Sequence, residues 1–125
     1  MTPKNESLLI GVVGPCGSGK TTLVKGLKDC GIVVRHIAQE HSYVKDMWKR
    51  ITNPDILIYL DVSYAEATRR RRLNWTKAEF DEQIRRLSHA REHADLVIFT
   101  DPLTPLTLVQ KVLGYLATHP TNSAE

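Results

Sequence analysis

Apolar runs alternate with amphipathic stretches along the chain. Runs that are continuously or mostly apolar predict strands at residues 8–13, 32–38, 55–61 and 95–101. Apolar residues at helical spacing predict helices over residues 20–30, 63–72, 76–94 and 104–117, with a short helix after Ser42. Strands that alternate with helices are typical of a parallel sheet covered on both faces. We therefore expect an α/β fold, a three-layer α/β/α arrangement with a small, mostly parallel sheet of about four strands.

Several predicted helices begin at residues that cap helix N-termini. Ser63 with Glu66, and Thr76 with Glu79, have the spacing of capping boxes. Thr104-Pro105 opens the last helix. That helix is expected to turn five apolar residues inward: Leu106, Val109, Val112, Leu113 and Leu116.

The length of 125 residues fits one domain spanning residues 1–125, with residues 118–125 as a frayed tail. No apolar run is long enough to cross a membrane, and residues 1–7 lack the apolar stretch of a signal peptide. The two cysteines, Cys16 and Cys30, are expected to be free thiols in a cytoplasmic protein. A net charge of +3 suits an anionic ligand without requiring nucleic acid.

Residues 14–21, GPCGSGKT, match the pattern G-x-x-x-x-G-K-[ST] between a predicted strand and a predicted helix. The glycines permit a backbone whose N–H groups turn inward around an anion, and the helix dipole adds positive potential there. Lys20 would reach the β- and γ-phosphates, and the Thr21 hydroxyl would bind Mg²⁺. The alternative is a chance glycine-rich turn. The expected nucleotide-binding residues here are Gly14, Pro15, Cys16, Gly17, Ser18, Gly19, Lys20, Thr21 and Thr22. Cys16 precedes a helix N-terminus, so we expect a reactive thiolate.

Three acidic residues end predicted strands and are candidates to assist Mg²⁺. Asp61 follows an apolar run and fits the hydrophobic-run-plus-acid pattern best, while Glu40 and Asp101 end other strands. A helix cap or a solvated strand end is the alternative for each. A right-handed crossover through the helix at 20–30 would place the strand that Glu40 follows beside the first strand.

Four successive arginines, residues 69–72, lie in the helix predicted over residues 63–72. They are either a solvated helical face or a clamp for transferring phosphoryl groups, which arginine stabilises through bidentate hydrogen bonds. Successive helical residues point about 100° apart, so only one or two of the four can face a ligand.

Three segments carry a family resemblance: GPCGSGKTTL, PDILIYLDVSYAEATRRRR and HADLVIFTDPLTPLTLVQKVLGYL. In these the chain resembles P-loop kinases of the nucleoside and nucleotide kinase type, such as adenylate, thymidylate and shikimate kinases. The resemblance implies that Glu40, rather than Asp61, is the metal or general-base residue. It also implies that Arg69 and Arg70 occupy the place of the first lid arginine, and that Asp101 and Pro102 lie near the base. The chain departs from these kinases in lacking a separate lid, one strand and a helical acceptor-binding segment.

The leading hypothesis is a minimal ATP- and Mg²⁺-dependent phosphotransferase with an unidentified small-molecule acceptor, which Arg35, His36, His41, Tyr43 and Trp48 could line. A nucleotide-binding regulatory module or slow NTPase is the alternative, and a nucleic-acid-binding ATPase is the least favoured. No N-K-x-D motif is present, which favours ATP over GTP. A small sheet with a free edge could also pair with a second copy as a homodimer.

Overall fold

Four parallel strands form one sheet in the order β2-β1-β3-β4. The computed structural model describes residues 8–72 and 74–118. The strands are β1 (Ile10–Val13), β2 (Val34–His36), β3 (Ile56–Asp61) and β4 (Leu96–Phe99). The predicted α/β class, with about four parallel strands, is confirmed, and β2 lies directly beside β1 as the crossover argument predicted.

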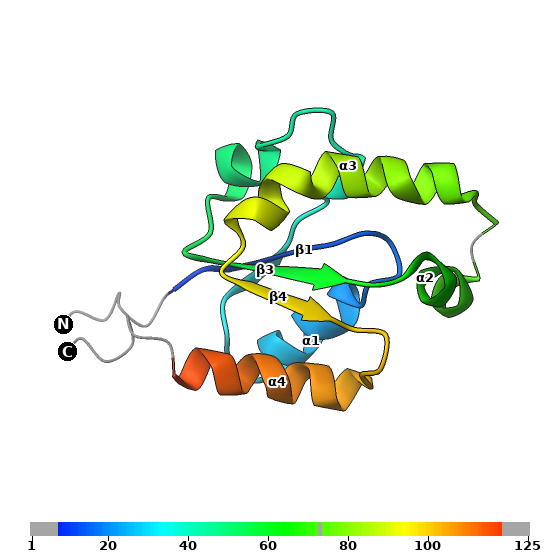
Figure 1. The fold of residues 1–125 in the computed structure, drawn as a ribbon. Helices are drawn as coiled ribbons and strands as arrows, with labels where there is room; N and C mark the ends of the chain where they lie inside the picture. The colour runs from blue at the N-terminus through cyan, green and yellow to red at the C-terminus, as the bar shows by residue number, and fades with distance from the viewer. Residues whose placement is uncertain (1–7, 73, 119–125) are drawn as a thin grey trace.

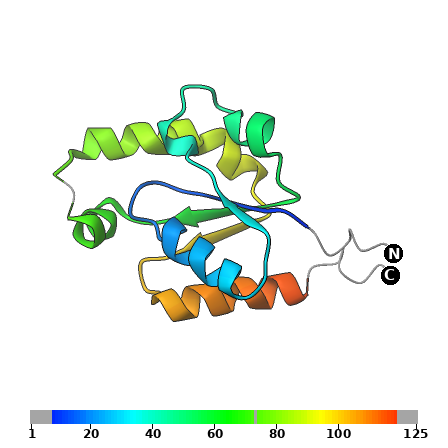
Figure 2. The ribbon, with the colours of Figure 1, turned by 180° about the vertical axis from the view of Figure 1, so that it is seen from behind.

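Helices cover both faces of the sheet (Figures 1 and 2). On one face lie α1 (Lys20–Asp29) and α4 (Pro105–Ala117). On the other lie α3 (Lys77–His93) and the single-turn π-helix η3 (Trp48–Thr52). The short helix α2 (Tyr64–Arg71) stands beyond the carboxyl ends of the strands, and the 3₁₀ turn η2 (Gln39–His41) follows β2.

Strand β3 supplies both cores because its side chains alternate between the faces of the sheet. Ile58 and Leu60 belong to the cluster under α1 and α4, whereas Leu57 and Tyr59 belong to the cluster under α3. The α1–α4 contact is close at Gly26, where an added Cβ would lie 2.5 Å from a methyl of Val109. These packed layers hold the carboxyl ends of the strands in fixed positions.

The chain after β2 differs from the predicted short helix. Ser42 caps no helix: its hydroxyl accepts from the backbone N–H of Val44 in a turn. The buried Gln39 side chain accepts from Trp48 N and donates to Val44 O. These hydrogen bonds satisfy backbone groups that a regular helix would have paired, and only the π-helical turn at Trp48–Thr52 remains.

Two further local predictions need correction. Leu106 is 66% exposed because it lies on the outer side of the first turn of α4, away from the core. Ser63 caps α2 as expected, but the Glu66 side chain does not complete a capping box and instead holds Arg69 and Arg70. By contrast, Thr76 and Glu79 form the full reciprocal box at α3.

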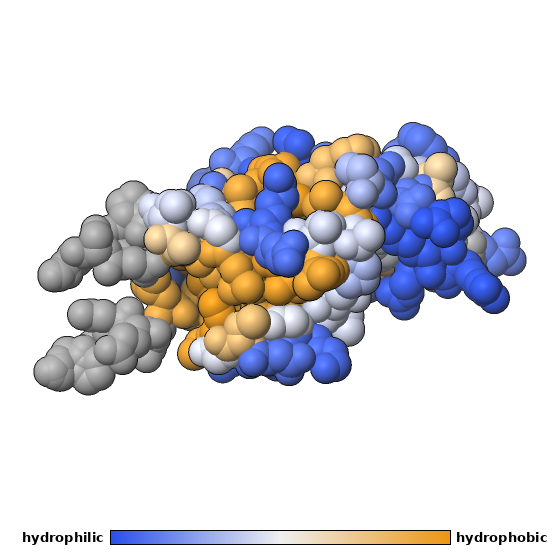
Figure 3. All heavy atoms as spheres, turned by 90° about the horizontal axis from the view of Figure 1, so that it is seen from below, coloured by the Kyte–Doolittle hydropathy of each residue, from blue (hydrophilic) through white to orange (hydrophobic). Residues whose placement is uncertain are grey.

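The surface is unevenly polar. Seen from the side of α4, apolar residues cross the middle of the face and hydrophilic residues gather at the end where α2 lies (Figure 3).

Within the described residues, no helix is both long enough and apolar enough to span a membrane. Most of the predicted tail, residues 119–125, lies outside the described part of the chain.

Candidate functional site

A cavity of about 780 Å³ opens at the carboxyl ends of the strands. Segments that follow β1, β2 and β4 line it together with α2 and the start of α4, which is the usual place for ligands of parallel sheets. The predicted site residues in its wall are Cys16, Gly17, Ser18, Gly19, Lys20, Thr21, Thr22, Glu40, Arg69, Arg70 and Asp101. Gly14, Pro15, Asp61 and Pro102 are not among the lining residues.

The segment at residues 14–21, here called the glycine loop, has a backbone that side chains would not allow. Gly17 has φ +86° and Gly19 has φ +106°, both in the left-handed region. A Cβ on Gly17 would also lie 2.8 Å from the backbone Cα and O of Ala67 in α2. The loop therefore passes close under α2 before it enters α1.

Five backbone amides between residues 17 and 22 donate no hydrogen bond to any described residue. They are the N–H groups of Gly17, Gly19, Lys20, Thr21 and Thr22. The other two amides after Pro15 are used: Cys16 N donates to Gln83 Oε1 and Ser18 N donates to Pro15 O. Free amides at a helix N-terminus create a strong preference for an anion.

Lys20 and Glu40 form a buried ion pair in the wall of the cavity. The Lys20 Nζ lies 2.8 Å from Glu40 Oε2, and the side chains are 5% and 3% exposed. The same ammonium donates to Gly14 O at 2.5 Å and to Pro15 O at 3.3 Å. The second carboxylate oxygen of Glu40, Oε1, is buried and has no hydrogen-bond partner among the described residues. An unpartnered buried carboxylate oxygen is costly and is suited to a cation or a donor.

Asp61, which fitted the acid pattern best by sequence, lies elsewhere. Its carboxylate pairs with Arg91 on α3 at 3.5 Å, and its backbone O accepts from Thr100 N at 2.8 Å. Burial, reinforced by the Asp61 charge, raises the pKa of the neighbouring Tyr59 to about 12, so this hydroxyl stays neutral. Of the two leading acids, only Glu40 lines the cavity.

Arg70 ties the glycine loop to the end of β4. Its guanidinium donates to Gly17 O at 3.1 Å and to Thr100 Oγ1 at 3.0 Å, and its Nε donates to Glu66. Thr100, which is buried and was not singled out by sequence, also donates from its hydroxyl to Ser18 O at 2.9 Å. The N–H groups of the Arg70 guanidinium thus donate to acceptors within the protein, and Arg70 acts as a structural brace between the glycine loop and β4.

The neighbouring arginines are more available. Arg69 is 72% exposed, against 22% for Arg70, and its partner is Glu66. Arg71 also lines the cavity, and its side chain makes no hydrogen bond or ion pair with any described residue. These two side chains are the ones in the helix that can reach toward a ligand.

Glu82 on α3 holds a second arginine pair with the same spacing. It binds Arg85 on the exposed side, while Arg86 turns inward. Arg86 reaches Glu40 O at 3.4 Å and lies 4.3 Å above the ring of Tyr43. The backbone carrying Glu40 is therefore fixed from α3.

Asp101 has a structural contact that the sequence did not reveal. Its carboxylate accepts from Ser63 N at 2.9 Å, at the entrance of α2. It still lines the cavity beside Leu103 and Leu108, which give this end an apolar wall. Pro102 is exposed next to it and does not line the cavity.

Cys16 faces η2 and α3. Its Sγ lies 3.7 Å from His41 Nε2 and accepts from Gln83 Nε2 at 3.3 Å. Gln83 binds both the backbone and the thiol of Cys16, a role that nothing in its sequence context signalled. The glycine loop and α3 are joined at this point.

The residues named for an acceptor pocket separate into two groups. His36 and His41 line the cavity. The other three do not: Arg35 is exposed on β2, Trp48 is buried against His89, and Tyr43 is exposed under Arg86. Partial burial and then the Lys20 charge lower the pKa of His36, against an opposing effect of Glu40.

Comparison with models of known protein families gave no match for this chain. A search of curated proteins likewise found no match.

Proposed function

We propose that the cavity binds ATP with Mg²⁺ and that the protein is a minimal kinase-like phosphotransferase acting on a small-molecule acceptor. The observation that carries the proposal is a set of five backbone amides at residues 17–22 that donate to no described residue, with the Lys20 ammonium beside them. Such amides can donate to phosphate oxygens without first breaking a hydrogen bond within the protein. The resemblance of the glycine loop to that of nucleoside and nucleotide kinases supports the same proposal.

Phosphate binding would change the partners of Lys20. The ammonium is held by Glu40 and two loop carbonyls, all within 3.3 Å. A triphosphate on the loop amides would bring oxygens that compete with Glu40 for this ammonium. Glu40 would then be released toward a metal-bound water or the acceptor hydroxyl.

The donor atoms present fit Mg²⁺. The Thr21 hydroxyl and the Glu40 carboxylate are hard oxygen donors in the same cavity, and Glu40 Oε1 has no hydrogen-bond partner in the described part of the chain. Thr21 and Glu40 would hold the ion, directly or through water, and the ion would neutralise charge on the phosphates. Arg69 and Arg71 would add positive charge from α2.

The other end of the cavity suits a nucleoside. Leu103 and Leu108 supply apolar surface, and Asp101 and Thr104 supply polar groups nearby. A volume of about 780 Å³ lies in the range of cavities that enclose cofactor-sized ligands. This supports a nucleotide over inorganic phosphate alone.

The test is calorimetric titration of Mg·ATP into the wild type, Lys20→Ala and Lys25→Ala. Lys25 lies on the same helix but is exposed and outside this cavity, so it controls for loss of charge. Lys20→Ala should weaken binding by roughly ten- to a hundredfold, because a charge-assisted hydrogen bond contributes about 1.5–3 kcal/mol. Equal affinity of a folded Lys20→Ala protein and the control would contradict nucleotide binding at this loop.

A second function, a nucleotide-binding regulatory module, is favoured by one observation. Between α1 and η2 the chain contains only the three-residue strand β2, so no helical segment is present there to enclose an acceptor. The two functions differ in turnover. A phosphotransferase should release ADP faster with some small phosphate acceptor in a screen, whereas a module should bind ATP and show no stimulated release.

A further inference from the structure

Three potential metal ligands meet at the edge of the cavity, on the side of the glycine loop that faces η2. Cys16 Sγ, His41 Nε2 and a Glu40 carboxylate oxygen all lie within 4.8 Å of one another. From this we infer that the chain has a site for a thiophilic divalent cation of the Zn²⁺ class. The site shares Glu40 with the proposed nucleotide site but does not depend on nucleotide binding.

The chemistry of the donors selects the cation. Thiolate, imidazole and carboxylate together are a ligand set for Zn²⁺ or Co²⁺, while Mg²⁺ prefers oxygen alone. Three protein ligands also leave a fourth tetrahedral position for water or a phosphate oxygen. A cation with Cys16 as ligand is therefore different from the Mg²⁺ that Thr21 and Glu40 would hold.

The spacing needs only small adjustments. His41 Nε2 lies 3.7 Å from Cys16 Sγ and 3.7 Å from Glu40 Oε2. Ligand atoms around a tetrahedral Zn²⁺ are separated by roughly 3.3–3.8 Å, given its bond lengths of about 2.0–2.3 Å. His41 is 59% exposed and can rotate, so the ring is free to complete the geometry.

A second observation points to a missing ligand. Glu40 is buried, and its two oxygens differ: Oε2, which lies 3.7 Å from His41 Nε2, is held by Lys20, whereas Oε1 has no hydrogen-bond partner among the described residues. A cation bound by both oxygens of this carboxylate would supply the interaction that Oε1 lacks. Gln83 holds Cys16 from α3 through both its backbone and its thiol, which is the kind of outer contact that orients a metal ligand.

The position predicts competition with the proposed function. A cation on Glu40 would place a double positive charge next to Lys20 and would occupy the carboxylate that assists Mg·ATP. Loading with Zn²⁺ should therefore remove the gain in ATP affinity that Mg²⁺ provides, and this second statement rests on the proposed function.

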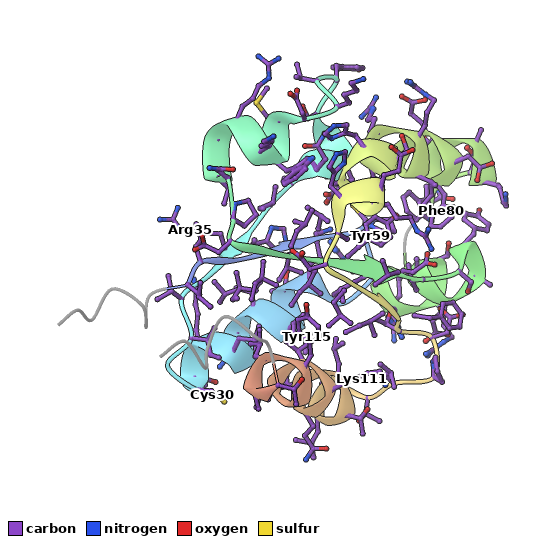
Figure 4. All side chains as sticks on the ribbon, turned by 60° about the vertical axis from the view of Figure 1, so that its left-hand side comes forward. Cys30, Arg35, Tyr59, Phe80, Lys111 and Tyr115 are labelled. Atoms are coloured by element: carbon purple, nitrogen blue, oxygen red, sulfur yellow. The ribbon has the colours of Figure 1, made fainter. Side chains whose placement is uncertain are left out.

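Cobalt provides a spectroscopic test without nucleotide. Co²⁺ is titrated into the reduced protein, kept reduced by a phosphine, and the thiolate-to-cobalt charge-transfer absorption is recorded. The control is Cys30→Ser, because Cys30 is exposed at the C-cap of α1, at the opposite end of that helix from Lys20, and does not line the cavity. Figure 4 shows Cys30 on the other side of the molecule from Phe80 in α3. The wild type and Cys30→Ser should each bind one equivalent of Co²⁺ and develop the charge-transfer absorption.

Cys16→Ser should lose the charge-transfer band, and His41→Gln should weaken Co²⁺ binding at least tenfold. His41 is exposed, so this variant should keep the fold, which far-UV circular dichroism checks. No band in the wild type, or a band that survives Cys16→Ser, would overturn the site. If Zn²⁺ binds but Mg·ATP does not bind the zinc-free protein, the proposed function fails and the cation site stands. If Mg·ATP binds and no cobalt band forms, the reverse holds. An unchanged dependence of ATP affinity on Mg²⁺ after Zn²⁺ loading would overturn the competition.

Discussion

Lys20 and Glu40 lie 2.8 Å apart, and each is the other's charged partner in the wall of the cavity. The positive charge of the glycine loop is thus already balanced before any ligand enters. Removing one member of a buried ion pair leaves the other charge unpaired, whereas a neutral isostere retains a hydrogen bond. Because Glu40 holds the Lys20 ammonium, the pair opposes anion binding. Single substitutions in the pair should therefore change the affinity of the cavity for an anion.

Glu40→Gln should tighten ATP binding when Mg²⁺ is absent. The substitution removes the negative charge that holds Lys20, so the ammonium becomes free for phosphate. We expect about five- to tenfold higher affinity in the presence of a chelator, or roughly 1–1.4 kcal/mol. The matched control is Asp61→Asn, which removes the same charge outside the cavity and should leave the affinity unchanged.

With Mg²⁺ present, the same two variants should differ in turnover, and here Glu40→Gln should be the impaired one. Glu40→Gln should lose most Mg²⁺-dependent ADP release, measured with the best acceptor from the screen, because the carboxylate beside the metal is gone. Asp61→Asn should keep it, since Asp61 pairs with Arg91 on α3. Loss of turnover in Asp61→Asn, with Glu40→Gln still active, would refute the assignment of Glu40.

Thr21→Val should reduce the dependence of ATP affinity on Mg²⁺. Both Thr21 and Thr22 line the cavity, but only the Thr21 hydroxyl is expected to bind the ion. The measured quantity is the ratio of ATP affinities with and without Mg²⁺. This ratio should fall severalfold in Thr21→Val and stay near the wild-type value in Thr22→Val. An equal fall in both variants would argue against a specific Mg²⁺ ligand.

Arg70→Gln should destabilise the fold, whereas Arg69→Gln should not. Arg70 is partly buried and bridges Gly17 O and Thr100 Oγ1, so its loss leaves several acceptors without a donor. We expect about 2–3 kcal/mol lower unfolding free energy in urea for Arg70→Gln. Arg69, paired with Glu66 at the surface, should change stability by no more than about 0.5 kcal/mol. Equal stability of the two variants would show that Arg70 is not a brace.

His36 should make the protein less stable as the pH falls below about 6.5. Partial burial and Lys20 lower the pKa of His36 in the folded protein, so the unfolded chain binds its proton first. Stability is then complete above the unfolded pKa and declines toward the lowered folded pKa. His36→Gln should flatten the change in urea midpoint between about pH 7.5 and pH 5.5. An unaltered pH profile would exclude this contribution.

The central strands β1 and β3 were predictable because both are buried runs in a parallel sheet, where almost every residue is apolar. The edge strands are less buried: β4 is apolar but partly exposed, and β2 carries the exposed Arg35 and His36. The order of the first two strands was predictable as well, since a right-handed crossover leaves β2 beside β1. That position brought Glu40 to the cavity, against the sequence pattern that favoured Asp61.

Other features depend on how elements rotate against one another, which spacing along the chain does not reveal. The rotation of α2 decides that Arg70, rather than Arg69, turns toward the glycine loop. The helix expected after Ser42 failed because the buried Gln39 side chain takes over the backbone groups of that segment. Gln83 is a polar residue in a polar stretch, so its contact with Cys16 could be found only from the packing of α3.

The all-parallel sheet has a consequence for folding. A parallel strand pair cannot close as a hairpin, so each of the three pairs needs a complete crossover before its first hydrogen bond forms. The hydrogen bond from Thr100 Oγ1 to Ser18 O then joins residues 82 positions apart. Contacts of such sequence separation form late and slow the folding of small domains. The glycine loop should therefore acquire its shape only when nearly the whole chain has folded, and a partly translated chain should not hold phosphate.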